Sequence, residues 1–305
     1  MKALVLTITF LSFFVSSCSV FEGPDGSLRP RIFNDGEQVG IIESVGLTES
    51  SGIAASRCND GVLWSHNDSG EEPVIYAFDV SGKAFGSYVV SNAENVDWED
   101  IAIIKNNEGC DIYIADIGNN YSLRDSFSIY VVSEPKLTQN ATGSGKLTAS
   151  RIDFSYDLPS NSKVPDAETM MVHPTTKDIF IITKTRSGPS TVFRIRNKDI
   201  EVEKLVAKKV AVVSVPSIPA GLLTGGDISP DGLRVALVDY LGAYEFSLKT
   251  RDEDFISVFE TNPVLVRFGR RTQGESITYS NDGRSLFGTS EGVNAPVIRS
   301  TAKND

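Results

Sequence analysis

The sequence predicts an all-β fold, and within that class a five-bladed β-propeller. One short motif recurs five times, a turn follows each copy, and each turn leads into further β-branched or apolar runs. Such repetition is typical of radially repeated β-folds, in which a repeat buries its apolar face only against its neighbours. The alternatives are a β-sandwich, which does not need the repeated motif, and a six-bladed propeller.

The motif places small or acidic residues before an Ile or Met that opens an apolar strand. Its five copies centre on Ile53, Ile101, Met170, Ile228 and Ile277. The turns that follow are Asn59–Gly61, Asn107–Gly109, Thr176–Asp178, Pro230–Gly232 and Asn281–Gly283. Asp-Gly and Asn-Gly supply the positive φ angles of tight hairpins, so each copy predicts the first two strands of one blade.

Outer strands complete the predicted blades. Fourth-strand candidates are Ala84–Ser91, Arg151–Tyr156, Val206–Val215 and Phe255–Val266. The fifth repeat ends after its third strand, and Val39–Gly46 precedes the first repeat without a partner. We therefore expect this N-terminal strand to close the last blade. The polar stretch Lys136–Ala149 predicts a long loop rather than part of a sixth blade.

The N-terminus predicts export and lipid anchoring. Lys2, an apolar run and two serines precede Cys18, as in a signal peptide. Residues 15–18 resemble a lipobox, which implies lipidation of Cys18, and Ser19 favours the outer membrane. The alternative is an ordinary secretory signal. The predicted organisation is a signal peptide over 1–17, a lipidated tether over 18–35 and one propeller domain over 36–305.

The net charge of −11 argues against nucleic acid and against adsorption to anionic lipid. We expect membrane attachment through the lipid alone, and a monomer. An acidic chain of this kind fits solubility and cation binding.

Carboxylates gather at one predicted rim, which we call the mouth. Because the second strand of each blade reverses the first, residues before strand one and after strand two share this rim. Crowded like charges are costly unless they are protonated, paired or bound to metal, and oxygen ligands favour Ca²⁺. The predicted calcium ligands are Glu49, Glu99, Asp100, Glu168, Asp227 and Glu275. Each could instead accept hydrogen bonds from neighbouring loops.

Further polar residues of the same loops predict a ligand site. His66 and Asp68 are the candidates for a proton acceptor, with a hydrogen-bonding spacer as the alternative for His66. Candidates for ligand contacts are Asn67, Asp116, Asn119, Lys184, Arg186, Asp239, Arg271 and Glu291.

Cys58 and Cys110 predict a disulfide. Both lie in the hairpin that links strands one and two, in successive repeats, and therefore on adjacent blades. An exported protein meets an oxidising compartment, in which such a bridge forms. The alternative is two unpaired thiols on separate turns.

The chain resembles exported bacterial propellers of the SdiA-regulated and phytase-like (esterase-like) groups. The resemblance lies in Glu49–Ile53, His66–Gly70, Asp97–Ile101 and Gly274–Ser276. It implies the propeller fold and leaves the activity open, because many members of these groups have no settled activity. The Asp-rich entry motif of the propeller phytases is missing, so the resemblance does not extend to phytate hydrolysis.

Two functions follow from these features. The first is a calcium-supported mouth that binds a small ligand and extends to hydrolysis of an ester, lactone or phosphate. The second is a non-catalytic module for a glycan or a protein of the cell envelope. Whether the protein is an enzyme stays open at this point.

Overall fold

The computed structural model describes residues 26–137, 143–217, 221–269 and 271–303. Over these residues the chain forms twenty-one strands and two short 3-10 helices, Asn197–Asp199 (η1) and Phe255–Glu260 (η2). The all-β prediction is confirmed. No described residue belongs to a helix that is long and apolar enough to cross a bilayer.

The strands form antiparallel meanders, in which most strands pair with the next along the chain. The first meander contains β2 (Ser50–Ala55), β3 (Val62–Asn67), β4 (Val74–Asp79) and β5 (Ala84–Ser91). The second contains β6 (Trp98–Lys105), β7 (Cys110–Asp116), β8 (Phe127–Ser133) and β10 (Ser150–Tyr156). The third contains β11 (Ala167–Val172), β12 (Ile179–Thr183), β13 (Ser190–Ile195) and β14 (Val206–Val213).

The last two meanders follow the same plan. The fourth contains β15 (Leu223–Ile228), β16 (Arg234–Asp239), β17 (Ala243–Ser247) and β18 (Val264–Val266). The fifth contains β19 (Gly274–Tyr279), β20 (Ser285–Ser290), β21 (Pro296–Thr301) and the N-terminal strand β1 (Glu37–Ile41). Strand β1 pairs antiparallel with β21, and Glu37 lies opposite Arg299. The N-terminus thus supplies the outer strand that the C-terminal repeat lacks.

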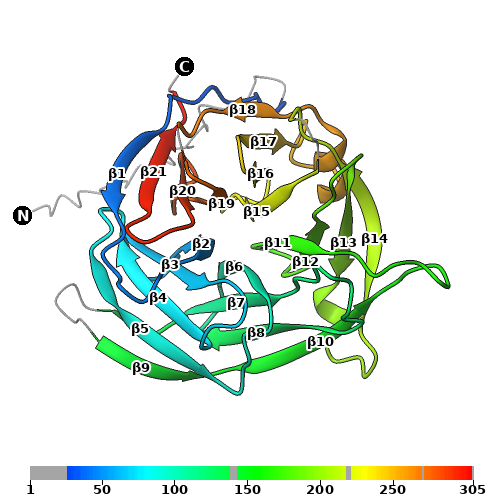
Figure 1. Ribbon diagram of the computed structural model, residues 1–305. Coiled ribbons are helices and arrows are strands. Elements are labelled where there is room, and N and C mark those ends of the chain that lie inside the picture. Colours follow the sequence, from blue (N-terminus) through cyan, green and yellow to red (C-terminus); the bar gives the residue numbers. More distant parts are fainter. Residues whose placement is uncertain (1–25, 138–142, 218–220, 270, 304–305) are drawn as a thin grey trace, which may run out of the picture.

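The meanders lie around a common centre, with β2, β6, β11, β15 and β19 innermost (Figure 1). These inner strands contact one another in a closed cycle, and β19 returns to β2. A cluster of buried apolar side chains fills each interface between neighbouring meanders in the described part of the chain. The core is therefore divided among the interfaces, and the centre is left to the inner strands.

The predicted loop over Lys136–Ala149 contains a strand, β9 (Gly143–Thr148). It pairs parallel with β5 of the first meander, and β10 pairs parallel with β14 of the third. Gly86 of β5 permits this close approach, because a Cβ there would lie 1.7 Å from the carbonyl oxygen of Gly143. Strands β9 and β10 therefore form a belt along the outside of three meanders, a pairing that polar composition does not reveal.

The predicted strand Phe255–Val266 is wrong in its first half. Residues 255–260 form η2, and only Val264–Val266 pairs as β18. The Asp254 carboxylate accepts a hydrogen bond from the Ile256 amide and caps the helix, while Val258 and Phe259 are buried. An apolar run packed against a neighbouring sheet can take either form, and the cap decides it.

Part of the predicted tether packs on the domain. Its first residues, 18–25, lie outside the described residues, but Leu28, Arg31 and Phe33 are buried. The Arg31 guanidinium binds the buried Glu245 carboxylate, with Arg31 Nε 2.9 Å from Glu245 Oε2. The tether is therefore shorter than the composition of residues 18–35 predicts.

The Cys58–Cys110 disulfide is confirmed. The two Cα atoms lie 6.0 Å apart, which is within the range of a disulfide. The bond joins the first meander to the second at the end of the inner strands opposite the mouth.

Candidate functional site

Each inner strand carries a one-residue bulge at its start, at the mouth. The register shifts place the extra residue at Ser51, Glu99, Glu168, Thr224 and Glu275. Bulges re-aim side chains and recur beside functional sites. Two of these residues, Ser51 and Thr224, donate hydroxyl hydrogen bonds to the next inner strand, and the other three are glutamates.

Three carboxylates converge beside the second bulge. Asp68 follows β3, Asp97 precedes β6 and Glu99 is the bulge residue; one oxygen from each lies within 4.8 Å of the others. We call Asp68, Asp97 and Glu99 the acidic triad. Two oxygens bound to one Ca²⁺ at about 2.4 Å are at most about 4.8 Å apart, so the triad fits the span of a single ion.

Glu99 is the most unusual member of the acidic triad. Only 4% of its surface is exposed. Among the described residues no hydrogen bond or ion pair reaches its carboxylate, and the charges that act on it most strongly are those of the carboxylates Glu168, Asp68 and Asp97. A buried carboxylate without a donor is costly, which favours a proton or a cation at this position.

Gly118 makes room for the triad. A Cβ at this position would lie 2.2 Å from Glu99 Oε1 and 2.3 Å from Asp97 Oδ2. Any side chain here would therefore displace the carboxylates. The glycine lies two residues after the end of β7, in the loop to β8, so loops and one bulge together form the cradle.

Burial and mutual repulsion act together on these groups. Burial, followed by repulsion from Asp68, raises the pKa of Asp97 to about 6. Burial, followed by repulsion from Glu168, raises the pKa of Glu99 well above its usual range, and burial also raises the pKa of Asp68. A bound cation would reverse this shift, because it favours the charged form.

Neighbouring carboxylates of the mouth already have partners. Lys184 Nζ binds the Glu168 carboxylate and lies 2.6 Å from the Tyr240 hydroxyl oxygen. Arg124 Nη1 lies 2.8 Å from Asp116 Oδ1. These two pairs lie beside the acidic triad, and in each of them the cation offsets the charge of its own carboxylate partner.

A second carboxylate pair lies further round the mouth. The Gln273 side-chain amide donates to Glu275 Oε1 at 2.6 Å and to Glu291 Oε1 at 2.7 Å. Burial raises the pKa of both carboxyl groups. Glu49 is exposed, and its backbone amide donates to the Asn67 side chain. The structure therefore separates Glu275 and Glu49 from the acidic triad.

Two predicted metal ligands lie deeper than expected. The Asp100 carboxylate is fully buried and accepts amide hydrogen bonds from Ile101, Met170 and Gly226, so it ties three meanders together. Asp227 lies near the far end of β15, where it accepts from Arg57 at 3.2 Å. Its expected place at the mouth is wrong.

The misplacement of Asp227 has a simple origin. The motif aligned Ile228 with Ile53 and Ile101, but the bulge of β15 is at Thr224, two residues earlier than that alignment requires. A shift of two keeps a side chain on the same face and moves it roughly 7 Å along the strand. The glycine pair at 225–226 hides the correct register from sequence comparison.

His66 lies below the mouth rather than in it. Its side chain is fully buried, packs edge-on against Trp98 and shares a hydrogen bond between Nδ1 and the Asn67 carbonyl at 2.9 Å. Burial lowers the pKa of His66 to about 4. Of the two predicted proton acceptors, only Asp68 reaches the mouth.

Several predicted ligand contacts shape loops. Asn67 accepts from the Thr48 and Glu49 amides, Asn119 holds the loop of Arg124, and Asp239 accepts from Leu241 and Gly242. Arg271 Nη2 approaches the Asp239 carbonyl at 3.5 Å, and its guanidinium lies 5.4 Å from the centre of the Phe268 ring. The predicted lipidation site, Cys18, lies outside the described residues.

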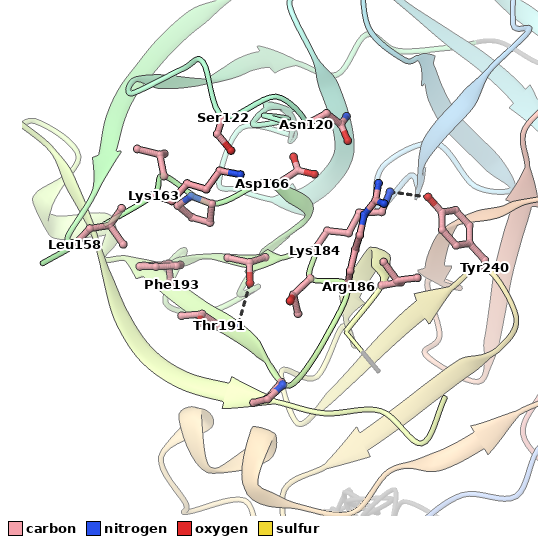
Figure 2. Close-up of a pocket in the computed structure, with 16 residues that line it drawn as sticks. Asn120, Ser122, Leu158, Lys163, Asp166, Lys184, Arg186, Thr191, Phe193 and Tyr240 are labelled. Carbon is pink, nitrogen blue, oxygen red and sulfur yellow. Dashed lines mark hydrogen bonds between the residues drawn. The ribbon is translucent and has the colours of Figure 1, made fainter. Parts of the chain in front are cut away.

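A cavity of about 940 Å³ opens next to the acidic mouth (Figure 2). Its wall includes Lys184 and Arg186, which the sequence predicts, and Lys163, Tyr240 and Phe193, which it does not. These residues come from the third and fourth meanders and from the connection between β10 and β11. Only the tertiary arrangement brings them together.

No protein-family model matches the chain, and no curated protein matches it in sequence. Among solved structures, the chain is similar to Raptor from Chaetomium thermophilum (8% identity, TM-score 0.47), covering 94% of this chain and 30% of that one. It is also similar to a chain of a nidogen–laminin complex (13% identity, TM-score 0.43), covering 79% and 72%. A third is a Bacteroides uniformis protein provisionally assigned as a 6-phosphogluconolactonase (14% identity, TM-score 0.40), covering 84% and 69%. The chain thus spans under a third of the Raptor chain, and no functional statement rests on these likenesses.

Proposed function

We propose that the acidic triad of Asp68, Asp97 and Glu99 holds a divalent cation, Ca²⁺ in the first instance, and that this cation supports the binding of a small ligand at the mouth. The observation that carries the proposal is the buried Glu99 carboxylate, which has two carboxylate neighbours and no donor among the described residues. Gly118 keeps that space open. Hard oxygen ligands of this kind suit Ca²⁺ better than a thiophilic metal.

The proposal includes the setting of the site. We propose a five-bladed propeller closed by β1, of the exported kind that the sequence motifs resemble, and anchored by a lipid on Cys18 to the outer membrane as a monomer. The closed cycle of inner-strand contacts supports the ring, and the disulfide suits an oxidising compartment.

Hydrolysis of an ester, lactone or phosphate is an extension of the same proposal. A divalent cation, when bound, polarises a carbonyl or phosphoryl oxygen. Asp68 is half-buried and lies at the mouth, and it offers one carboxylate oxygen to the cation, so its other oxygen is the candidate to accept a proton there. Lys184, which is hydrogen-bonded to the Tyr240 hydroxyl, is close enough for its charge to act on Asp68.

Calcium titration of the purified protein tests the cation site. After EDTA treatment, addition of Ca²⁺ at a hundred times its dissociation constant should stabilise the fold by about 2.7 kcal/mol, measured as a rise in Tm. Glu99→Gln and Gly118→Ala should abolish the rise. Glu43→Gln, an exposed carboxylate on a neighbouring loop, is the matched control. A Tm that responds to neither Ca²⁺ nor Mg²⁺ would refute the cation site.

A second function, docking of a glycan or a protein, has its own supporting observation. The most exposed apolar side chains lie in loops on the mouth side, among them Leu123 (87%), Val45 (87%), Tyr121 (86%) and Leu241 (77%). Exposed apolar side chains mark a binding surface where they form a contiguous patch, and these four lie on the same side of the molecule. Tyr121→Ser with Leu123→Ser should weaken macromolecular binding and leave calcium stabilisation unchanged, which separates the two functions.

A further inference from the structure

The 940 Å³ cavity beside the mouth differs in charge from the rest of the molecule. Three cations, Lys163, Lys184 and Arg186, line it against one carboxylate, Asp166. The whole chain has a net charge of −11, so this local excess of positive charge runs against the composition. Figure 2 shows these side chains gathered around one hollow.

The three cations are not equivalent. Lys184 is bound to Glu168 and Tyr240, and its charge is compensated. Lys163 and Arg186 are exposed, and within the described residues neither makes a hydrogen bond or an ion pair. Asp166, the one carboxylate, accepts the Asn119 amide at 2.7 Å. Lys163, Arg186 and Asp166 therefore leave the cavity lining with one net positive charge, in addition to the Lys184–Glu168 pair.

Part of the wall is apolar, and Figure 2 shows Leu158 and Phe193 near Lys163. Leu158 and Val164 are half-buried and pack against the cluster that contains Phe193, and Leu222 borders the cavity from the connection before β15. A hollow of this size, with an apolar wall and a few polar groups, matches sites for small organic ligands. A guanidinium can bind a carboxylate or a phosphate through two parallel hydrogen bonds.

We propose that this cavity binds a small organic anion, with a carboxylate or phosphate head held by Lys163 and Arg186 and an apolar body against Leu158, Val164 and Phe193. The inference rests on the proposed function in one respect: the end of the ligand outside the cavity would meet the cation at the acidic triad. Lys184 stands at the boundary, because it lines the cavity and its charge also acts on Asp68 of the acidic triad. The anionic head and the apolar body thus anchor a ligand whose remaining end points towards the mouth.

Calorimetry with four probes tests the anion site. Phenyl phosphate and benzoate carry both a charge and an apolar body, benzyl alcohol lacks the charge, and inorganic phosphate lacks the body. We expect phenyl phosphate or benzoate to bind at least tenfold more tightly than benzyl alcohol and inorganic phosphate. Equal affinities would overturn the proposal.

Two double variants locate the site. Lys163→Gln with Arg186→Gln should weaken the favoured probe at least tenfold. Lys208→Gln with Lys209→Gln removes the same charge from two exposed positions of β14 and should change the affinity less than twofold. Equal losses in both variants would show a non-specific charge effect and overturn the assignment.

The same titrations in Ca²⁺ and in EDTA separate the two proposals. If the favoured probe binds in both, and Lys163→Gln with Arg186→Gln weakens it, the anion site stands whatever the calcium titration shows. If the probe fails to bind while Ca²⁺ still raises the Tm, the anion site fails and the cation site stands.

Discussion

Buried carboxylates at the two ends of the inner strands differ in their hydrogen-bond partners. At the mouth, Glu99 has carboxylate neighbours and no donor among the described residues. At the far end, Asp227 accepts from Arg57 at 3.2 Å, from the Thr278 hydroxyl at 2.9 Å and from the Tyr279 amide at 2.8 Å. Both carboxylates are largely buried, but within the described residues Asp227 has donors and Glu99 has none.

This difference separates structure from binding. A compensated carboxylate serves the fold, because its desolvation is offset by its donors. An uncompensated one destabilises the fold until a cation or proton arrives. Counting carboxylates in the sequence cannot distinguish the two cases, whereas their partners can.

The largest effect is expected from breaking a compensated pair. Arg31→Ala removes the guanidinium that binds Glu245, whose side chain is fully buried. The loss of one partner from a buried ion pair costs about 3–5 kcal/mol. Chemical denaturation measures this loss, with Arg29→Ala, an exposed neighbour, as the control. An equal, small effect of both variants would show that Arg234, 3.8 Å from Glu245, suffices.

The disulfide should come next. Cys58→Ser with Cys110→Ser opens a loop of 52 residues, which costs about 4 kcal/mol when the unfolded chain gains the corresponding entropy. Reduction of the native protein should give the same loss of unfolding free energy. A loss below about 1 kcal/mol would show that packing alone holds the first two meanders together.

Protonation of His66 should lower the stability of the protein in acid. Its pKa of about 4 lies below the ordinary 6.5, because burial disfavours the charged ring. A depressed pKa gives stability that is complete above pH 6.5 and is lost as the pH falls through 4. The lost stability amounts to about 3 kcal/mol. Carboxyl groups with raised pKa values, Asp97 among them, contribute with the opposite sign over the same pH range. The His66 slope is therefore measured as the difference between the native protein and His66→Asn in urea titrations between pH 7 and 4.

The smallest effect concerns Asp97 and has the opposite sign. Its pKa is raised to about 6, mainly by burial, so the metal-free protein loses stability as the pH rises from about 4 to 6. Ca²⁺ should remove this loss, because it favours the carboxylate. The Tm against pH, in EDTA and in Ca²⁺, measures the effect. Parallel curves would argue against Asp97 as a ligand, and Glu43→Gln serves as the reference variant.

Local patterns predicted much of the fold. The recurring motif and the turns that follow its copies located the inner hairpins, and the matching positions of Cys58 and Cys110 predicted their bond. Local patterns failed at β9 and at η2, where pairing with a distant strand or a capping contact decided the form. Composition alone cannot report contacts between residues far apart in sequence.

For the site, the sequence by itself determined that acidic residues, Asp68 among them, gather at one rim, because the second strand of each hairpin reverses the first. Only the tertiary structure decided which of them meet. The bulge register sent Asp227 to the far end, the packing of Trp98 buried His66, and Gly118 left room for Asp97 and Glu99. The reason is physical: hairpin geometry is local, whereas burial and the distance between two charges depend on residues brought together from different meanders.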